Sequence, residues 1–132
     1  MIQLSIAARN AKLNAMDEFM SGGSLLRIMS GVIPINCKEK DTGLMLAELK
    51  LYSGFMQKAA EAVKENTNED ELIAIESGYA NYFRFVNNQN ECNMQGTISI
   101  EGGAGDMIVD RTSITKNQKI IVLSISMFEG NP

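Results

Sequence analysis

Residues 94–100, MQGTISI, alternate apolar and polar side chains at every step. Because every second side chain of an extended chain lies on the same face, the apolar Met94, Gly96, Ile98 and Ile100 share one face. Gln95, Thr97 and Ser99 lie on the other face. This period of two predicts a β-strand with one face toward a core.

Similar runs, separated by glycine, asparagine or proline, predict further strands at 25–30, 44–52, 72–76, 79–86, 107–109 and 119–128. In the last run the pattern places Ile121, Leu123, Ile125 and Met127 on one face. Segment 54–66 is ambiguous, because its alanines and lysines favour a helix whereas a strand could begin near Ala62. Short strands at this spacing predict a mainly β fold, an antiparallel β-sandwich of jelly-roll or immunoglobulin-like type, over residues 23–132.

The first twenty residues have the period of an α-helix with two apolar strips. One strip comprises Ile2, Ile6, Leu13, Met16 and Met20, and the other comprises Leu4, Ala8, Ala15 and Phe19. Ser21-Gly22-Gly23 is a typical glycine-rich helix end. We therefore expect an N-terminal helical arm at 1–22, joined to the β-sandwich in a single domain. One strip can pack on that domain and the other on a neighbour, although alanines also suit close packing alone.

The totals limit the function classes. The chain has 132 residues, 45% of them hydrophobic and 21% charged, and a net charge of -4, which is ordinary for one globular domain and does not indicate a nucleic-acid surface. Its apolar stretches are shorter than the roughly 20 residues that cross a bilayer, and its start lacks the pattern of a signal peptide. We expect a protein that stays in the cytoplasm where it is made and binds no membrane.

Catalytic chemistry would depend on cysteines, carboxylates and lysines, since the chain has no histidine. Cys37 lies beside Lys38 and Lys40, which could lower its pKa, but a nucleophilic cysteine normally needs a base. A small buried apolar residue is the favoured interpretation. Cys37 and Cys92 could form a disulfide only if their Cα atoms lie within about 7 Å, and a cytoplasmic origin argues against it.

Two further segments resemble functional motifs without matching them. EGGAGDMIVD at 101–110 lacks the Lys-Ser/Thr end of a phosphate loop and the spacing of a calcium loop, so it predicts a β-turn between two strands. The adjacent carboxylates at 69–71 are typical of a solvated turn. Two cysteines do not supply a zinc site. The sequence therefore predicts no enzyme, with no catalytic residue, cofactor or metal site.

Aromatic residues occur on both faces of the strand expected at 79–86, which contains Tyr79, Tyr82, Phe83 and Phe85. A strand that is covered on one face by its own sheet partner and on the other by another protein would explain this pattern.

Motifs along nearly the whole chain occur in a recognisable order. They are LSIAARNAKLNAM, LLRIMSGVIPINC, DTGLMLAELKL, YFRFVNN, CNMQGTI and GGAGDMIVDRTSI. In this succession the chain resembles a family of small virion structural proteins encoded by tailed bacteriophages and prophages. The resemblance implies a β-sandwich with an N-terminal helical arm that oligomerises on a phage particle. Segment 54–72 departs from the family pattern.

The resemblance leads to an expected role in the virion, after assembly in the cytoplasm of the host bacterium. A capsid decoration or cement protein is the first expectation, and a tail, fibre or head-to-tail joining component is the alternative. The expected partners are further copies of the chain and other virion proteins, above all the major capsid protein, without direct nucleic-acid binding. The candidate subunit interface comprises Leu4, Ala8, Ala15 and Phe19 in the helix, and Lys38, Lys40 and Asp41 in the connection after the first strand. Removal of residues 1–20 is expected to leave the β-domain folded and to abolish binding.

Overall fold

The computed structural model describes residues 1–20 and 24–129. Within them the chain forms one helix, α1 (Ile6–Met20), followed by strands only. The strands are β1 (Leu25–Met29), β2 (Met45–Lys50), β3 (Val63–Asn66), β4 (Asp70–Ile73), β5 (Gly78–Tyr79), β6 (Tyr82–Val86), β7 (Cys92–Ile100), β8 (Met107–Val109), β9 (Ser113–Ile114) and β10 (Lys119–Phe128). The prediction of a mainly β chain with an N-terminal helix is confirmed.

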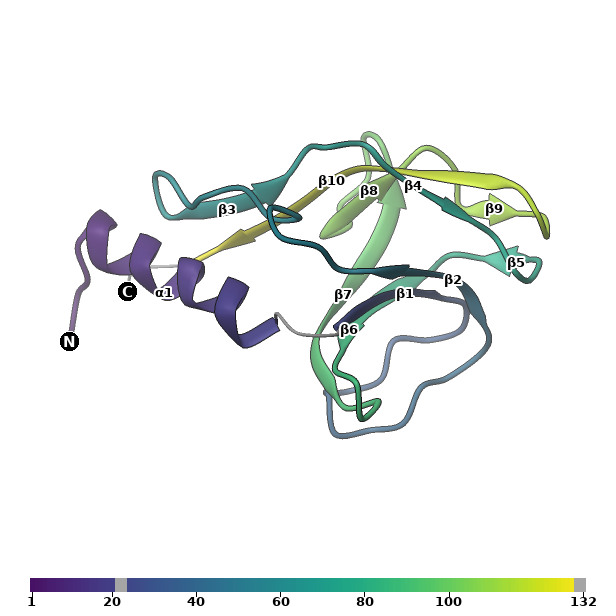
Figure 1. Ribbon diagram of the computed structural model, residues 1–132, viewed down its shortest axis with the longest axis horizontal. Helices are drawn as coiled ribbons and strands as arrows, with labels where there is room; N and C mark the ends of the chain where they lie inside the picture. Colours follow the sequence, from purple (N-terminus) through teal and green to yellow (C-terminus); the bar gives the residue numbers. More distant parts are fainter. Residues whose placement is uncertain (21–23, 130–132) are drawn as a thin grey trace.

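Eight of these strands form a single curled sheet (Figure 1). Its order is β2-β1-β6-β7-β8-β10-β3, with β4 also paired to β10, while β5 and β9 form a separate ribbon. Neighbouring strands are antiparallel except β7 and β8, which are parallel. The fold is thus a mixed sheet resembling half a barrel, and the expected antiparallel sandwich is not confirmed.

Strand β7 explains why the sheet curls instead of splitting into two layers. Its first part pairs with β6 up to Thr97, and its last part, Ile98–Ile100, pairs with β8. One strand therefore belongs to both halves of the sheet. The concave side encloses one hydrophobic core that contains residues from both halves, including Leu26, Ile28, Phe83, Phe85, Met107, Val109, Ile120, Val122 and Ile125.

The glycine-rich segment 101–106 links the two parallel strands, whereas the sequence analysis predicted a simple turn. A parallel connection usually needs a dozen or more residues. Here the chain folds back tightly along β7: the Gly105 amide donates to Ser99 Oγ at 2.9 Å, and the Thr97 amide donates to Asp106 Oδ2 at 3.0 Å. A Cβ atom at Gly105 would lie 2.5 Å from the Ser99 amide nitrogen. Only glycine allows this approach.

Other expected elements differ locally from the structure. The strand expected at 79–86 is divided into β5 and β6, because the chain changes partner strand: the Ala80 amide donates to the Thr112 carbonyl beside β9, and the Asn81 amide donates to the Met29 carbonyl of β1. Segment 54–66 contains no helix and ends in β3. The predicted face of β10 is wrong in its first half: Ile120 and Val122 are buried there instead of Ile121 and Leu123. The register shift between Val122 and Ser124 changes the face.

Helix α1 lies at one end of the molecule beside β3 (Figure 1). Ser5 caps it, since its Oγ accepts from the Ala8 amide at 3.1 Å. Leu13 and Met20 are buried as expected, but Ile2 and Ile6 of the same strip are exposed, and Ile2 and Leu4 precede the helix. The expected helix end at Ser21-Gly22-Gly23 lies outside the described residues.

Candidate functional site

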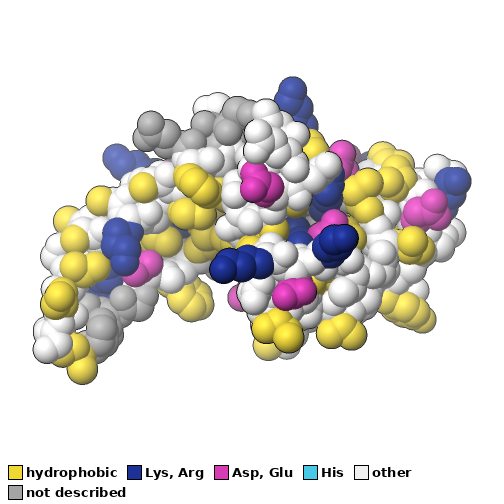
Figure 2. Space-filling view, turned by 90° about the horizontal axis from the view of Figure 1, so that it is seen from below, with side chains coloured by type: hydrophobic (Ala, Val, Ile, Leu, Met, Phe, Trp, Pro, Cys, Tyr) yellow, Lys and Arg dark blue, Asp and Glu magenta, His cyan; other side chains and the backbone are white. Residues whose placement is uncertain are grey.

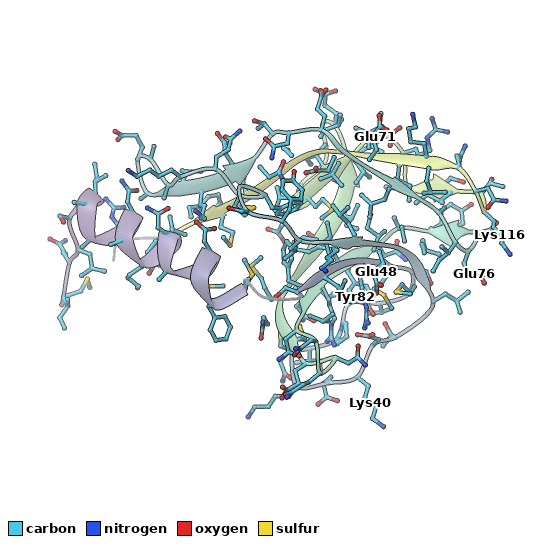
Figure 3. All side chains as sticks on the ribbon, viewed as in Figure 1. Lys40, Glu48, Glu71, Glu76, Tyr82 and Lys116 are labelled. Atoms are coloured by element: carbon cyan, nitrogen blue, oxygen red, sulfur yellow. The ribbon has the colours of Figure 1, made fainter. Side chains whose placement is uncertain are left out.

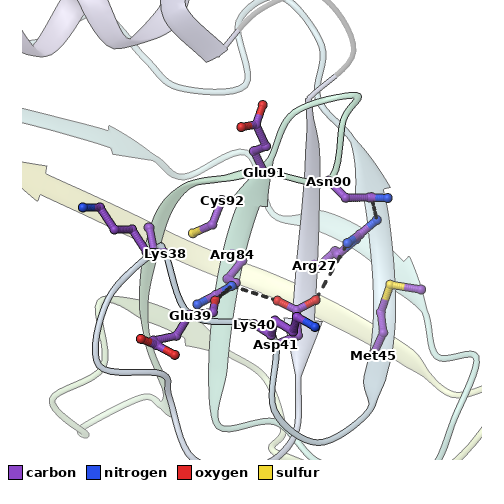
Figure 4. A pocket seen from close by; sticks show the side chains of 11 residues that line it. Arg27, Lys38, Glu39, Lys40, Asp41, Met45, Arg84, Asn90, Glu91 and Cys92 are labelled. Atoms are coloured by element: carbon purple, nitrogen blue, oxygen red, sulfur yellow. Dashed lines mark hydrogen bonds and ion pairs between the residues drawn. The ribbon is translucent and has the colours of Figure 1, made fainter.

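Residues 31–43, here called the covering loop, lie over the convex side of β1, β6 and β7. A cavity of about 890 Å³ opens between this loop and the β6–β7 hairpin (Figure 4). Its lining residues are Arg27, Cys37, Lys38, Glu39, Lys40, Asp41, Met45, Arg84, Asn90, Glu91 and Cys92. The cavity thus includes the three loop residues of the expected interface.

A polar row crosses four strands beneath the covering loop. Glu48, Arg27, Arg84 and Gln95 are successive partners in the registers of β2, β1, β6 and β7. Two arginines are therefore directly opposite each other, an arrangement that repels unless a negative group intervenes. Asp41 of the covering loop is that group: its Oδ1 lies 3.0 Å from Arg84 and its Oδ2 lies 3.9 Å from Arg27 (Figure 4).

Arg84 is 3% exposed and uses its whole guanidinium group within the protein. Nη1 donates to the Glu39 carbonyl at 2.8 Å and to Asp41 Oδ1 at 3.0 Å. Nη2 donates to the Asn36 carbonyl at 3.2 Å, and both Nη2 and Nε donate to Gln95 Oε1. A saturated arginine is not available to an incoming anion. It stabilises the covering loop instead.

Arg27 completes the network on the neighbouring strand. Its Nε donates to Glu48 Oε2 at 2.8 Å, and its Nη2 donates to Asn90 Oδ1 at 2.8 Å. With Glu48 and Asp41 beside Arg27 and Arg84, the charges under the loop balance. The two arginines are therefore not available as a cationic centre for a phosphate or another anion.

Tyr82 and Gln95 hold the rest of the covering loop. The Tyr82 hydroxyl donates to the Thr42 carbonyl at 2.8 Å and accepts from the Thr42 amide at 2.9 Å, and Gln95 Nε2 donates to the Pro34 carbonyl at 2.7 Å. All five residues of β6 are consequently buried. The two-sided cover inferred from the aromatic residues exists, but its second side is this chain's own loop and not another protein.

The expected loop interface divides into two kinds of residue. Lys38 and Lys40 are exposed and make no ion pair with any residue that the structure describes, and Lys40 lies at the outer edge of the loop (Figure 3). Asp41 is fixed between two arginines. Asp41 therefore stabilises the fold, and only the lysines are free for contact with another molecule.

Cys37 and Cys92 meet at the wall of the cavity. Both are free thiols, both are half-buried and both line the cavity, and the Cys92 thiol donates to the Met94 carbonyl at 3.4 Å. Burial and the contact with Cys37 raise the pKa of the Cys92 thiol to about 12. At neutral pH a thiol with this pKa is almost entirely protonated, so Cys92 is a poor nucleophile. From the sequence alone it was open whether the two cysteines lie near each other.

Only Ala15 and Phe19 of the expected N-terminal interface face fully outward. Ala15 is exposed and the Phe19 side chain is 66% exposed, while Ala8 and Leu4 are half-buried. Figure 2 shows hydrophobic side chains over the end of the molecule that carries α1, interspersed with basic ones. From Leu13 onward the helix thus has one side on its own domain and one side toward solvent, whereas the expected division into two strips does not hold before Leu13.

In the described part of the chain, no three cysteine or carboxylate groups gather where they could hold a metal ion. Besides the two thiols, the ionisable groups that line the cavity are those of Arg27, Lys38, Glu39, Lys40, Asp41, Arg84 and Glu91.

No protein-family model matches the chain, and no curated protein or solved structure does either. Among the residues that the structure describes, no helix is long and apolar enough to cross a membrane.

Proposed function

We propose that this protein is a bacteriophage virion structural protein that decorates or cements the capsid by binding the major capsid protein. The observation that carries the proposal is the outward strip of α1, defined by the exposed Ala15 and Phe19. A phenylalanine that is 66% exposed on a helix is costly in water, and apolar surface of this kind is typical of protein contacts.

The anchoring of α1 supports the same role. Asn10 Oδ1 accepts from the Ala62 amide at 2.8 Å, and Asn14 Oδ1 accepts from the Ala59 amide at 2.9 Å. Asn10 and Asn14 lie on the inner side of the helix, opposite the outward strip. A helix that is fixed in this way presents its outward strip without loss of conformational entropy on binding.

The covering loop supplies a second, charged surface. Lys38 and Lys40 project from a loop that Arg84, Gln95 and Tyr82 hold in place, so they form a preorganised positive rim. Charged rims increase association rates and fix orientation more than they add affinity. We assign to them the orientation of the subunit on the particle.

Binding to empty heads of the phage that encodes the chain tests the proposal. Heads assembled without the protein are mixed with wild-type protein, the Phe19→Ser variant and the control Val32→Ser, whose side chain is 80% exposed in the covering loop. We expect saturable binding of wild type and control, and at least a tenfold weaker affinity for Phe19→Ser. Absence of binding together with a ring or fibre formed by the protein alone would assign it to the tail, a fibre or the head-to-tail joint. A monomer that binds no virion component would contradict the proposal.

A further inference from the structure

We propose that Cys37 and Cys92 form a reversible intramolecular disulfide that fastens the covering loop to the β6–β7 hairpin when a small-molecule disulfide such as oxidised glutathione is present. The two thiols line the same cavity and interact with each other there, and they belong to segments that are 55 positions apart in the sequence. Neither thiol has an assigned role in the proposed function.

Cys37 has a fixed position before any bond forms. The carbonyls of Asn36 and Glu39, on either side of it, both accept from the buried Arg84 guanidinium. The Lys38 amide donates to Asn36 Oδ1 at 2.9 Å, which closes a tight turn at this point. The loop therefore does not need to reorganise to bring Cys37 to its partner.

A β-bulge directs Cys92 toward the loop. Phe85 pairs with Met94 but the next residue, Val86, pairs with Cys92, so Asn93 is an extra residue in β7. Without the bulge, the alternation of side chains along β7 would place Cys92 on the core face, whereas Gln95 lies on the convex face. With it, Cys92 lies on the same convex face as Arg84. Bulges often redirect a side chain in this way.

The chemistry is thiol–disulfide exchange in two steps. One protein thiolate attacks a sulfur of oxidised glutathione, which forms a mixed disulfide and releases one glutathione thiolate. The other protein thiolate attacks the protein sulfur of the mixed disulfide and releases the second. The protein loses two protons and two electrons, and one oxidised glutathione becomes two reduced molecules. The open cavity beside Cys92 gives the reagent access (Figure 4).

The environment of the two thiols favours a disulfide that forms slowly, after the protein has folded. The high pKa of Cys92 makes the exchange slow at neutral pH. A reducing cytoplasm keeps the pair as thiols during synthesis, and an oxidising medium outside the cell converts it to the disulfide. For a virion protein, the covering loop would then become covalently fixed after release from the host.

Equilibration of the purified protein in glutathione buffers of graded redox ratio tests the inference. In oxidised glutathione we expect a monomer that has lost two hydrogens in mass and both maleimide-reactive thiols, and whose Tm is about 10 °C above that of the reduced protein. Excess reduced glutathione should reverse all three changes. Cys37→Ser and Cys92→Ser should show no rise in Tm in the same buffers and should form only mixed disulfides or dimers.

Two results would overturn the inference: a wild-type protein that keeps both thiols in oxidised glutathione, or one that forms only intermolecular bonds. Comparison of the reduced and oxidised wild type does not depend on the stability of the serine variants. Because the isolated protein is used, the result is independent of capsid binding, and failure of either proposal can be recognised separately.

Discussion

Lys64 Nζ lies 2.8 Å from Asp17 Oδ2, and this ion pair joins β3 to α1. The Lys64 side chain is fully buried, and its ammonium also donates to Asn14 Oδ1 and to the Gln57 carbonyl, each at 3.0 Å. All three protons of the ammonium are thus satisfied. A buried cation that is satisfied in part by the helix makes α1 a component of the domain and not a detachable arm.

Asp17→Asn is expected to lower the free energy of unfolding by about 1–2 kcal/mol. The substitution removes the carboxylate partner that the structure describes for a buried ammonium, although the Asp17 side chain is half exposed and water reduces the loss. Urea unfolding measures it. Glu71→Gln is the matched control, because Glu71 pairs with Lys119 where both side chains are more than half exposed, and we expect a change below about 0.5 kcal/mol. Equal changes in the free energy of unfolding for the two variants would show that the Lys64–Asp17 pair stabilises the protein no more than an exposed pair does.

Deletion of residues 1–20 is now expected to disrupt the β-domain, contrary to the expectation from the sequence. It removes Met20 from the core and leaves Lys64 without two of its acceptors. Each change lowers the free energy of unfolding by about 2–5 kcal/mol. The sum of the two approaches the whole free energy of unfolding of a small domain. Circular dichroism and hydrogen exchange measure the outcome. A truncated protein with protected amides in β6 and β7 would show that the helix is dispensable for folding.

Arg84→Lys should destabilise the protein by about 2–4 kcal/mol, because a lysine cannot replace the planar set of five N–H donors. The carbonyls of Asn36 and Glu39 would lose their donor, so faster hydrogen exchange is expected in the covering loop. Arg111→Lys is the control, since Arg111 is exposed and contacts only Asp110. A covering loop that exchanges at the wild-type rate in Arg84→Lys would contradict the role assigned to the guanidinium.

Elements with a strong local pattern were predictable from the sequence. The alternation in MQGTISI lies within β7, and residues 119–128 coincide with β10. The helix was recognised from its period, yet its inner side is partly polar: Asn10, Asn14 and Asp17 satisfy donors of segment 59–64. No local pattern indicates that polar side chains on a helix will bind donors of a distant segment.

Features that depend on distant partners were not predictable. A six-residue connection normally joins antiparallel strands. The parallel pairing of β7 and β8 could therefore be predicted only if the contact between Gly105 and Ser99 were already known. The bulges at Asn93 and Leu123 change the face of each strand without a clear mark in the sequence. Arg84 in the middle of a buried strand was a usable signal, since a buried charge must have partners. Its partners in the covering loop lie more than 40 positions away.

Alkaline pH should lower the free energy of unfolding of the reduced protein, because the Cys92 thiol ionises more easily in the unfolded chain. Its thiol has a pKa of about 12 in the folded state and about 8.5 in the unfolded chain. Between these values the unfolded state releases a proton that the folded state keeps, so the free energy of unfolding falls as pH rises from about 9 toward 12. Below about pH 8 the thiol is protonated in both states, and the protein keeps its full stability with respect to this group.

Unfolding of wild type and Cys92→Ala in urea, with a reductant present, isolates this effect. We expect a shallower decline for Cys92→Ala above pH 9. The Tyr52 hydroxyl, whose pKa is raised by burial and by its hydrogen bond to Asp70, contributes a decline above pH 10 to both proteins. Parallel curves for the two proteins would show that the Cys92 pKa is not raised.

Gly105→Ala tests the tight parallel connection between β7 and β8. The added Cβ would meet the backbone of Ser99 at 2.5 Å, and backbone cannot move aside without breaking the pairing of Ser99 with Ile108. We expect a loss of about 3 kcal/mol or more, near the upper part of the range for single substitutions. Gly102→Ala is the control in the same segment, because Gly102 has a φ of +88° but nothing within 4 Å of its Cβ position. It should cost only about 1 kcal/mol, the strain of a positive φ. The two free energies of unfolding therefore separate steric contact from backbone strain, and a Gly105→Ala variant no less stable than Gly102→Ala would argue against the close return of the chain along β7.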